Sequence, residues 1–386
     1  MRSGGSSACL NHTLRSSIAA TVKSAALALK DVTDDRWLIY GAYGYTGELI
    51  AREAVDRGLD PILAGRTRGK LDRLAEDLGC DFRAFGLSDE ALPQLLDDVA
   101  IVLNCAGPFA ETYEPMVGAC LESGTHYLDI TGEIEVFEAI KGYDERAHEA
   151  DVMLLPGVGF DVVPSDCLAA HLAERLPDAE SLALGFKAEG GFSPGTMKTA
   201  IDGLGEGGMI RRGGQLESVP AAWKTREIDF GDGPAMATTF PWGDVSTAHH
   251  TTGIPDIEFY LAFPPSTIER MKYQRYLAPV LSLGPVKSLL KSLVDRKVDG
   301  PDAETRETTD ALLWGEVSDG EQTLTSRLRT PNTYRLTTLS ALEILQRVLD
   351  GDAPVGYQTP ASAYGPDLVL SIEGVERTDE PAETPN

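Results

Sequence analysis

Residues Trp37–Gly47 read W-L-I-Y-G-A-Y-G-Y-T-G, so four apolar residues run directly into a glycine-rich turn. A short continuous apolar run is typical of a strand that is buried on both faces of a parallel sheet. The glycines after it would let a pyrophosphate approach bare backbone, and the next helix would present its N-terminal N–H groups to that anion. We therefore predict a dinucleotide-binding turn. Its expected cofactor contacts are Gly41, Tyr43, Gly44, Tyr45, Thr46 and Gly47.

From Asp34 onward, strand-like apolar runs alternate with amphipathic helix-like runs. Repeated β-α-β units predict an α/β fold of the Rossmann type, with a doubly wound parallel sheet and right-handed crossovers. Within this region we expect a short helix over 90–96 and one long helix over 134–150.

After Gly157 the pattern changes to glycine-rich loops and short strands, which predicts an inserted α+β domain with a mixed sheet. A helix is expected over 196–210, and a hairpin is expected where 311–317 and 323–329 flank Asp319-Gly320. The acidic end of the chain, from about Glu376, is expected to be unstructured.

The end of the second strand predicts the cofactor. An NAD-binding fold places an acidic residue here for the ribose 2′-hydroxyl, whereas this chain has Arg66, followed by Arg68 and Lys70. A guanidinium can hold a 2′-phosphate through two charge-assisted hydrogen bonds. The sequence therefore predicts NADP(H) rather than NAD(H). A solvent-facing arginine without a ligand is the alternative.

Three further strand ends supply candidate site residues, because the carboxyl ends of parallel strands line the ligand crevice. The run over 99–105 is followed by four expected cofactor contacts: Ala106, Gly107, Pro108 and Phe109. The candidate catalytic groups, for substrate binding or proton transfer, are Asp129, Glu133, Asp161 and Tyr113. The alternative is structural: Thr131 would cap a helix with Glu133 in its first turn, and Tyr113 would be a packing aromatic.

The composition excludes some functions. The chain has 386 residues and a formal net charge of -26, from 60 acidic and 34 basic residues, which is the wrong sign for a nucleic-acid binder. Acidity spread along the whole chain favours adaptation to a salt-rich cytoplasm, and ordinary solubility charge is the alternative. Five cysteines without C-x-x-C spacing indicate reduced thiols in a cytoplasmic protein, and no apolar run is long enough to span a bilayer. Adjacent residues His249 and His250, expected on a strand, would point apart, so no metal site is predicted.

Several sequence blocks, taken together and in this order, resemble the saccharopine dehydrogenase-like oxidoreductases. They are residues 41–47, 64–66 with Lys70-Leu71, 104–109, 124–133, 159–166, 193–196 and 359–365. Within the family, the chain is more similar to the branch that includes trans-acting enoyl reductases than to lysine-pathway enzymes. The resemblance implies a Rossmann domain, an inserted domain and a C-terminal segment that returns to the Rossmann domain.

Combined with the resemblance, the expected organisation is an unstructured extension over 1–33, an NADP-binding domain over 34–160, a substrate or dimerisation domain over 161–334, a returning segment over 335–372 and a tail over 373–386. The main hypothesis is an NADP(H)-dependent reductase of a C=C bond in a small, lipid-like substrate. Saccharopine-type C=N chemistry is the alternative reaction, and a non-catalytic NADP(H)-binding scaffold is the alternative class. A homodimer is the candidate oligomeric state.

Overall fold

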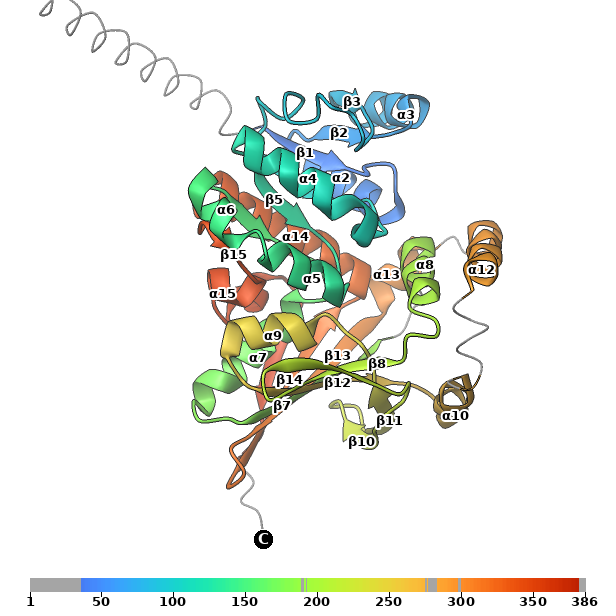
Figure 1. Ribbon diagram of the computed structural model, residues 1–386, viewed down its shortest axis with the longest axis vertical. Helices are drawn as coiled ribbons and strands as arrows, with labels where there is room; N and C mark the ends of the chain where they lie inside the picture. Colours follow the sequence, from blue (N-terminus) through green and yellow to red (C-terminus); the bar gives the residue numbers. More distant parts are fainter. Residues whose placement is uncertain are drawn as a thin grey trace, which may run out of the picture.

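The computed structural model describes residues 36–381, except 189, 190, 192, 275, 277–282, 298 and 299. Two sheets dominate this part of the chain, one above the other in Figure 1. The extension predicted over 1–33 lies outside the described residues. No helix in the described part is both long enough and apolar enough to cross a membrane.

The first sheet is parallel, and its strands follow the order β15-β6-β5-β4-β1-β2-β3. The order 3-2-1-4-5-6 is that of a Rossmann fold, whose ligand crevice lies at the carboxyl ends of β1 and β4, where the strand order reverses. The predicted fold class is confirmed. The strands are β1 (Trp37–Tyr40), β2 (Ile62–Gly65), β3 (Phe82–Ala84), β4 (Ile101–Asn104), β5 (His126–Asp129), β6 (Met153–Leu155) and β15 (Gly356–Tyr357).

The central strand β1 is buried on both faces, as its apolar run predicted. Trp37 and Ile39 belong to one hydrophobic cluster, while Leu38 and Tyr40 belong to another on the opposite face. All four are at most 2% exposed. The helices that accompany this sheet are α2 (Tyr45–Asp56), α3 (Arg68–Leu78), α4 (Phe109–Ser123), α5 (Ile134–Lys141) and α6 (Asp144–Ala150).

The second sheet is mixed and follows the path β10-β11-β12-β7-β13-β14-β16, with β8 added beside β12 and β9 beside β8. Only the β7–β12 pairing is parallel among these described strands. The predicted hairpin is confirmed as β13 and β14. The strands are β7 (Ser181–Ala188), β8 (Gly208–Arg212), β9 (Gln215–Val219), β10 (Thr225–Asp229), β11 (Pro234–Thr239), β12 (Asp256–Ala262), β13 (Asp310–Ser318), β14 (Thr323–Pro331) and β16 (Glu376–Asp379).

Helices connect the two sheets. In Figure 1, α7 (Val163–Arg175) and α9 (Asp244–Thr252) lie between them, and α14 (Thr333–Leu349) runs upward from the second sheet. Helix α14 packs against α2, and Arg335 forms an ion pair with Glu53 across this contact at 2.5 Å. The remaining helices are α8 (Pro194–Asp202), α10 (Pro265–Gln274), α12 (Gly284–Lys297), α13 (Ala303–Thr308), α15 (Pro360–Tyr364) and the 3-10 helix η2 (Leu368–Ser371).

Three helix predictions are wrong. Residues 90–96 form turns, and the helix expected over 134–150 is divided into α5 and α6 at Gly142, a residue with low helix propensity. The helix expected over 196–210 ends at Asp202, because Gly205 and Gly207 adopt the left-handed conformation, with φ of +94° and +86°. Strand β8 then begins at Gly208.

Two further predictions fail because of long-range contacts. His249 and His250 lie in α9 rather than on a strand, and α9 packs against both α7 and α5. The tail predicted to be unstructured from Glu376 begins with β16, which pairs with β14 from Ser326 to Arg329. In both cases tertiary packing overrides the local sequence preference.

Candidate functional site

The turn after β1 is so tightly closed that two of its glycines leave no room for a side chain. Gly41 has a φ of +84°, and a Cβ there would lie 2.9 Å from the backbone nitrogen of Ala106. A Cβ on Gly47 would lie 2.4 Å from the carbonyl oxygen of Gly41. Gly44 N–H donates to that same carbonyl at 2.9 Å, and α2 begins at the next residue. Bare backbone in front of a helix N-terminus fits the pyrophosphate of a dinucleotide.

The end of β2 presents three exposed basic side chains beside this turn. Lys70 Nζ lies 5.2 Å from the ring centroid of Tyr43, and Arg68 lies over the Phe82 ring at 5.3 Å. Arg66, Arg68 and Lys70 form no ion pair with a carboxylate in the described part of the chain. Three unpaired cations in so acidic a chain fit the extra phosphate of NADP.

The loop after β4, which holds Ala106, Gly107, Pro108 and Phe109, is fixed by a buried asparagine. Asn104 is fully buried, and its Oδ1 accepts a hydrogen bond from Ala106 N–H at 3.1 Å. Its Nδ2 donates to the hydroxyls of Thr112 and Tyr127, at 3.2 and 3.3 Å. Ala106 also packs directly on Gly41. The sequence-predicted cofactor residues of β1 and β4 are therefore brought together, and Asn104 was missed as their support.

Glu133 holds the N-terminus of α4. Its Oε1 accepts a hydrogen bond from Phe109 N–H at 3.0 Å, and its Oε2 accepts one from Ala110 N–H at 2.9 Å. Burial raises the pKa of Glu133, while these two hydrogen bonds oppose the shift. Thr131 does not cap the helix; its Oγ1 accepts a hydrogen bond from Glu133 N–H, and Glu133 is the N-cap of α5. The geometry assigns Glu133 a structural task.

Replacing Glu133 by Gln should lower the free energy of unfolding by roughly 1–3 kcal/mol. The amide NH₂ of Gln cannot accept a hydrogen bond, so one of the two α4 N–H groups loses its partner. Chemical denaturation measures the loss. The matched control is Glu135→Gln, an exposed glutamate in the first turn of α5, which should change stability by no more than about 0.5 kcal/mol. Equal effects of the two substitutions would contradict the structural assignment.

Asp129 is a second buried carboxylate whose oxygens are already used. Its Oδ1 accepts hydrogen bonds from the N–H groups of Thr131 and Gly157, both at 2.9 Å, and its Oδ2 accepts one from the Tyr127 hydroxyl at 2.8 Å. Burial raises the pKa of Asp129 to about 6, although all three hydrogen bonds favour the ionised form. Asp129 thereby ties the end of β5 to the segment after β6.

Asp161 differs from the other two carboxyl groups because its carboxyl oxygens accept no hydrogen bond from the described residues. The side chain is half-buried, and its Oδ2 lies 2.8 Å from the position that a Cβ on Gly132 would occupy. Burial, followed by the negative charge of Glu133, raises the pKa of Asp161 to about 7. A carboxyl group of this kind can gain and lose a proton near neutral pH.

Tyr113, the fourth catalytic candidate, forms no hydrogen bond with these carboxyl groups in the described part of the chain. Like Phe109 and Tyr143, it is half-buried against one of the hydrophobic clusters of the first sheet, and burial raises the pKa of its hydroxyl. Packing of this kind agrees with the alternative reading of Tyr113 as a structural aromatic.

An aromatic cluster next to Asp161 was not predicted. The indole N–H of Trp242 donates to the backbone carbonyl of Asp161 at 2.7 Å. The Trp242 ring stacks on Phe259 and meets Phe186 edge-on, with centroid distances of 5.6 and 4.9 Å. Phe240 and Phe263 extend the cluster and are half-buried. These residues come from separate strands of the second sheet and the loop before α9, so no local spacing in the sequence reveals them.

Asp244, at the start of α9, is a further group that the sequence did not single out. It is fully buried, and neither carboxyl oxygen has a hydrogen-bond partner at normal geometry. Burial, followed by the negative charge of Asp166, raises its pKa well above the ordinary value.

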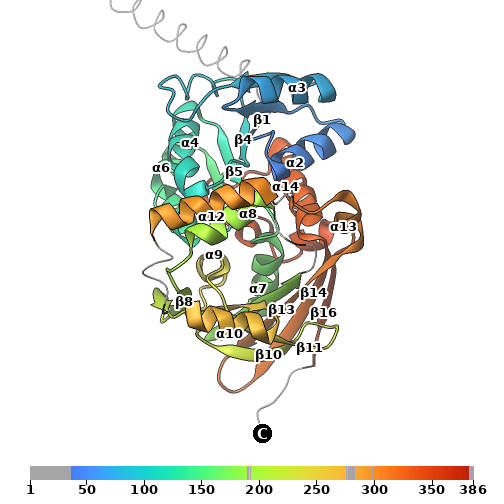
Figure 2. The same ribbon diagram turned by 90° about the vertical axis from the view of Figure 1, so that its right-hand side faces the viewer.

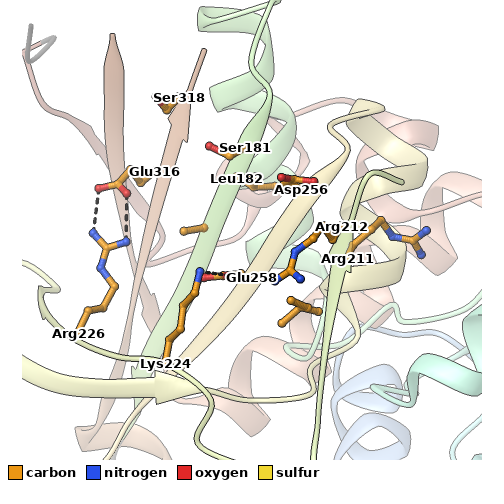
Figure 3. Close-up of a pocket in the computed structure, with 12 residues that line it drawn as sticks. Ser181, Leu182, Arg211, Arg212, Lys224, Arg226, Asp256, Glu258, Glu316 and Ser318 are labelled. Atoms are coloured by element: carbon orange, nitrogen blue, oxygen red, sulfur yellow. Dashed lines mark hydrogen bonds and ion pairs between the residues drawn. The ribbon is translucent and has the colours of Figure 1, made fainter. Parts of the chain in front are cut away.

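A polar cavity of about 280 Å³ lies on the second sheet, away from the glycine-rich turn. Two ion pairs form between its lining residues. Arg226 binds Glu316 through two hydrogen bonds of 3.1 Å, and Lys224 pairs with Glu258 (Figure 3). No sequence-predicted site residue lines this cavity. The candidate site is instead the carboxyl edge of the first sheet.

Comparison with known proteins agrees with this geometry. Residues 37–155 match the saccharopine dehydrogenase NADP binding domain. The human saccharopine dehydrogenase-like oxidoreductase is 31% identical over 202 residues, which cover 45% of this chain and 47% of the relative. A Mycobacterium tuberculosis protein named as a trans-acting enoyl reductase is 32% identical over 184 residues, 43% of each chain. This chain thus aligns with about half the length of the curated relatives it matches.

Among solved structures, saccharopine dehydrogenase (L-Glu forming) from Saccharomyces cerevisiae superposes with a TM-score of 0.62. The superposition covers 90% of this chain and all of the yeast chain, but the sequence identity is 11%, so it supports the fold alone. The domain match confirms the predicted cofactor, NADP(H). Residues 37–155 thus match a saccharopine dehydrogenase NADP binding domain, and this chain is similar to the saccharopine dehydrogenase-like oxidoreductases over about half of its length.

Proposed function

We propose that this protein is an NADP(H)-dependent oxidoreductase that reduces the C=C bond of an apolar, lipid-related enoyl substrate. The observation that carries the proposal is Asp161, a half-buried carboxyl group with a pKa of about 7 and no hydrogen bond to its oxygens from the described residues. It lies at the carboxyl edge of a dinucleotide-binding sheet, which is where such folds carry out their chemistry.

The cofactor would be held by residues already described. The turn of Gly41, Gly44 and Gly47 would take the pyrophosphate, and Arg66 would take the 2′-phosphate with Arg68 and Lys70 beside it. The loop from Ala106 to Phe109 would lie against the ribose and the nicotinamide. When bound, the nicotinamide supplies a hydride.

Asp161 would supply the proton that completes the reduction. A group that ionises near pH 7 is protonated in a useful fraction of molecules and still releases its proton readily. Asp129 and Glu133 are poorer donors, because their oxygens already accept hydrogen bonds from backbone N–H groups. Asp129 and Glu133 thus stabilise the structure of the site, and Asp161 remains as the candidate proton donor.

The aromatic cluster beside Asp161 favours an apolar substrate. Trp242 contacts the backbone of Asp161, and the half-buried rings of Phe240 and Phe263 extend the apolar surface away from it. A saccharopine-type substrate would instead need free basic groups for its carboxylates. Arg211 is buried and bonded to Glu138 and two backbone carbonyls, and Arg212 pairs with Glu217. The enoyl reaction is therefore the better fit.

A substrate panel tests the proposal. NADPH consumption would be followed with a prenyl or acyl enoyl substrate and, in parallel, with an imine formed from an amino acid and an oxo acid. We expect turnover with the enoyl substrate. Turnover only with the imine would favour the saccharopine-type reaction, and tight NADPH binding without any turnover would favour a non-catalytic scaffold.

Replacing Arg66 by Ala should weaken NADPH binding by roughly tenfold to hundredfold and leave NADH binding almost unchanged. The side chain is expected to contact only the phosphate that distinguishes the two cofactors. Calorimetric titration with each cofactor measures the preference. The control Arg73→Ala removes the same charge from an exposed position on α3 and should change neither affinity by more than about twofold. An unchanged NADPH preference in Arg66→Ala would exclude this role.

A further inference from the structure

Tyr45 joins the glycine-rich turn to a distant part of the chain. It is the first residue of α2, and its hydroxyl donates to the carbonyl oxygen of Pro301 at 2.5 Å. The Arg306 guanidinium donates to the same hydroxyl at 3.0 Å. Gly300 has no room for a side chain, because a Cβ there would lie 2.7 Å from the Tyr45 ring. The Tyr45 side chain is therefore held by the segment from Gly300 to Arg306.

Tyr334 contacts both Tyr45 and the start of α8. Its ring meets the Tyr45 ring edge-on, with centroids 5.1 Å apart and an interplanar angle of 82°. Its hydroxyl accepts a hydrogen bond from Ser193 N–H at 2.5 Å and lies 3.2 Å from Thr196 Oγ1. Ser193 is the N-cap of α8, and its own Oγ accepts from Thr196 N–H. Two tyrosines thus link the nucleotide turn to the first turn of α8.

Helix α8 lies near the candidate site. The negative charge of Asp202, its last residue, is one of the lesser causes, after burial, that raise the pKa of Glu133. Lys291 of α12 binds Asp202 at 2.5 Å, and Lys287 donates to the Asp202 carbonyl. Figure 2 shows α8 and α12 at the level between the two sheets, in front of the helices of the first. We call this pair the α8–α12 wall (Pro194–Asp202 and Gly284–Lys297).

We propose that Tyr334 is a positioning residue that sets the α8–α12 wall against the substrate side of the site in response to cofactor bound at the turn. The inference rests on the proposed function, because it requires NADP(H) to bind the turn that Tyr45 follows. Because Tyr45 is the first residue of α2, cofactor bound at the turn would further restrain a ring that already contacts Pro301, Arg306 and Gly300. Through the edge-on contact, the Tyr45 ring fixes Tyr334 and the cap of α8.

Tyr334→Phe should separate cofactor binding from the response of α8. Among the described residues, the Tyr334 hydroxyl contacts Ser193 and Thr196 at the start of α8. Tyr334→Phe keeps the ring contact with Tyr45 and removes the hydrogen bond to Ser193. NADPH affinity should then change by less than about threefold, because no expected cofactor contact is altered. The response of α8 to the cofactor should be lost.

Hydrogen exchange of the amides in 194–202, measured with and without NADPH, tests this. In the wild type we expect NADPH to slow exchange roughly two- to tenfold, and in Tyr334→Phe we expect no slowing. Thr196→Val is a milder variant that leaves Tyr334 in place and should weaken the response. The control Tyr273→Phe alters a tyrosine of α10 that is 67% exposed, and it should respond as the wild type does.

The outcomes separate the two proposals. NADPH binding with no effect on α8 in the wild type, or with equal effects in the wild type and Tyr334→Phe, would overturn the role of Tyr334 and leave the cofactor assignment intact. Absence of NADPH binding in the folded wild type would overturn the proposed function, and this inference with it.

Discussion

The Gly47→Ala protein should bind NADPH roughly tenfold to hundredfold more weakly than the wild type while remaining folded. The added Cβ would lie 2.4 Å from the Gly41 carbonyl oxygen, 3.0 Å from the Gly41 carbonyl carbon and 3.1 Å from Ala42 Cα. All three are backbone atoms, so no flexible side chain can move aside. Helix α2 must shift away from the turn, and its N–H groups then no longer converge on the pyrophosphate. Calorimetric titration with NADPH measures the loss.

Gly118→Ala is the matched control for this substitution. Gly118 also lies within a helix, α4, but a Cβ there would meet nothing within 4 Å. This change should leave NADPH binding unaltered and stabilise the protein by about 0.5–1 kcal/mol, because Ala has the higher helix propensity. If Gly47→Ala bound NADPH as tightly as the control, the glycine-rich turn would not be the pyrophosphate site.

The first sheet was predictable because its information is local. Four apolar residues before a glycine turn indicate a strand buried on both faces, and β1 is such a strand. Repetition of this pattern through β6 predicts a parallel sheet, since parallel strands require helical crossovers. The basic residues after β2 could be identified for the same reason: Arg66 follows its strand directly.

The different roles of Asp129, Glu133 and Asp161 could not be predicted from the sequence. Glu133 binds backbone groups 23 and 24 residues earlier in the chain, and Asp129 binds one 28 residues later. The sequence shows that all three acids follow strands, but not which of them meet N–H groups. That depends on the lengths and packing of the intervening segments. Asp161 stands out only once those hydrogen bonds are known.

The elements of the second sheet were harder to predict because they also depend on long-range contacts. Strand β16 pairs with a strand about 50 residues earlier, and its sequence, E-R-T-D, carries no apolar signal. Helix α9 reads D-V-S-T-A-H-H-T-T, which has low helix propensity. Its helical form depends on packing against α7, which the sequence does not show. The aromatic cluster around Trp242 is likewise assembled from separate elements.

Asp161→Asn should lower kcat by roughly a hundredfold to ten-thousandfold and leave NADPH affinity unchanged. Asn has nearly the same shape as Asp, so the contact with Gly132 is kept, but it has no proton to donate. The wild-type kcat should fall as pH rises above about 7, because Asp161 then loses its proton. That alkaline decline should be absent in Asp161→Asn. Steady-state rates with an enoyl substrate across pH 5–9 (about two units on either side of the Asp161 pKa) measure both effects.

Stability gives an independent check of the same carboxyl group. The pKa of Asp161 in the folded protein is raised above its ordinary value of 3.8 to about 7, so ionising it destabilises the fold. Its contribution to stability is fully present below about pH 4 and is lost as pH rises through 7. Asp161→Asn should therefore raise Tm at pH 8 more than at pH 4. The control Asp72→Asn, at an exposed position on α3, should raise Tm neither at pH 8 nor at pH 4. A kcat unchanged in Asp161→Asn, with the Tm shift present, would keep the buried carboxyl but assign the proton donor to another group.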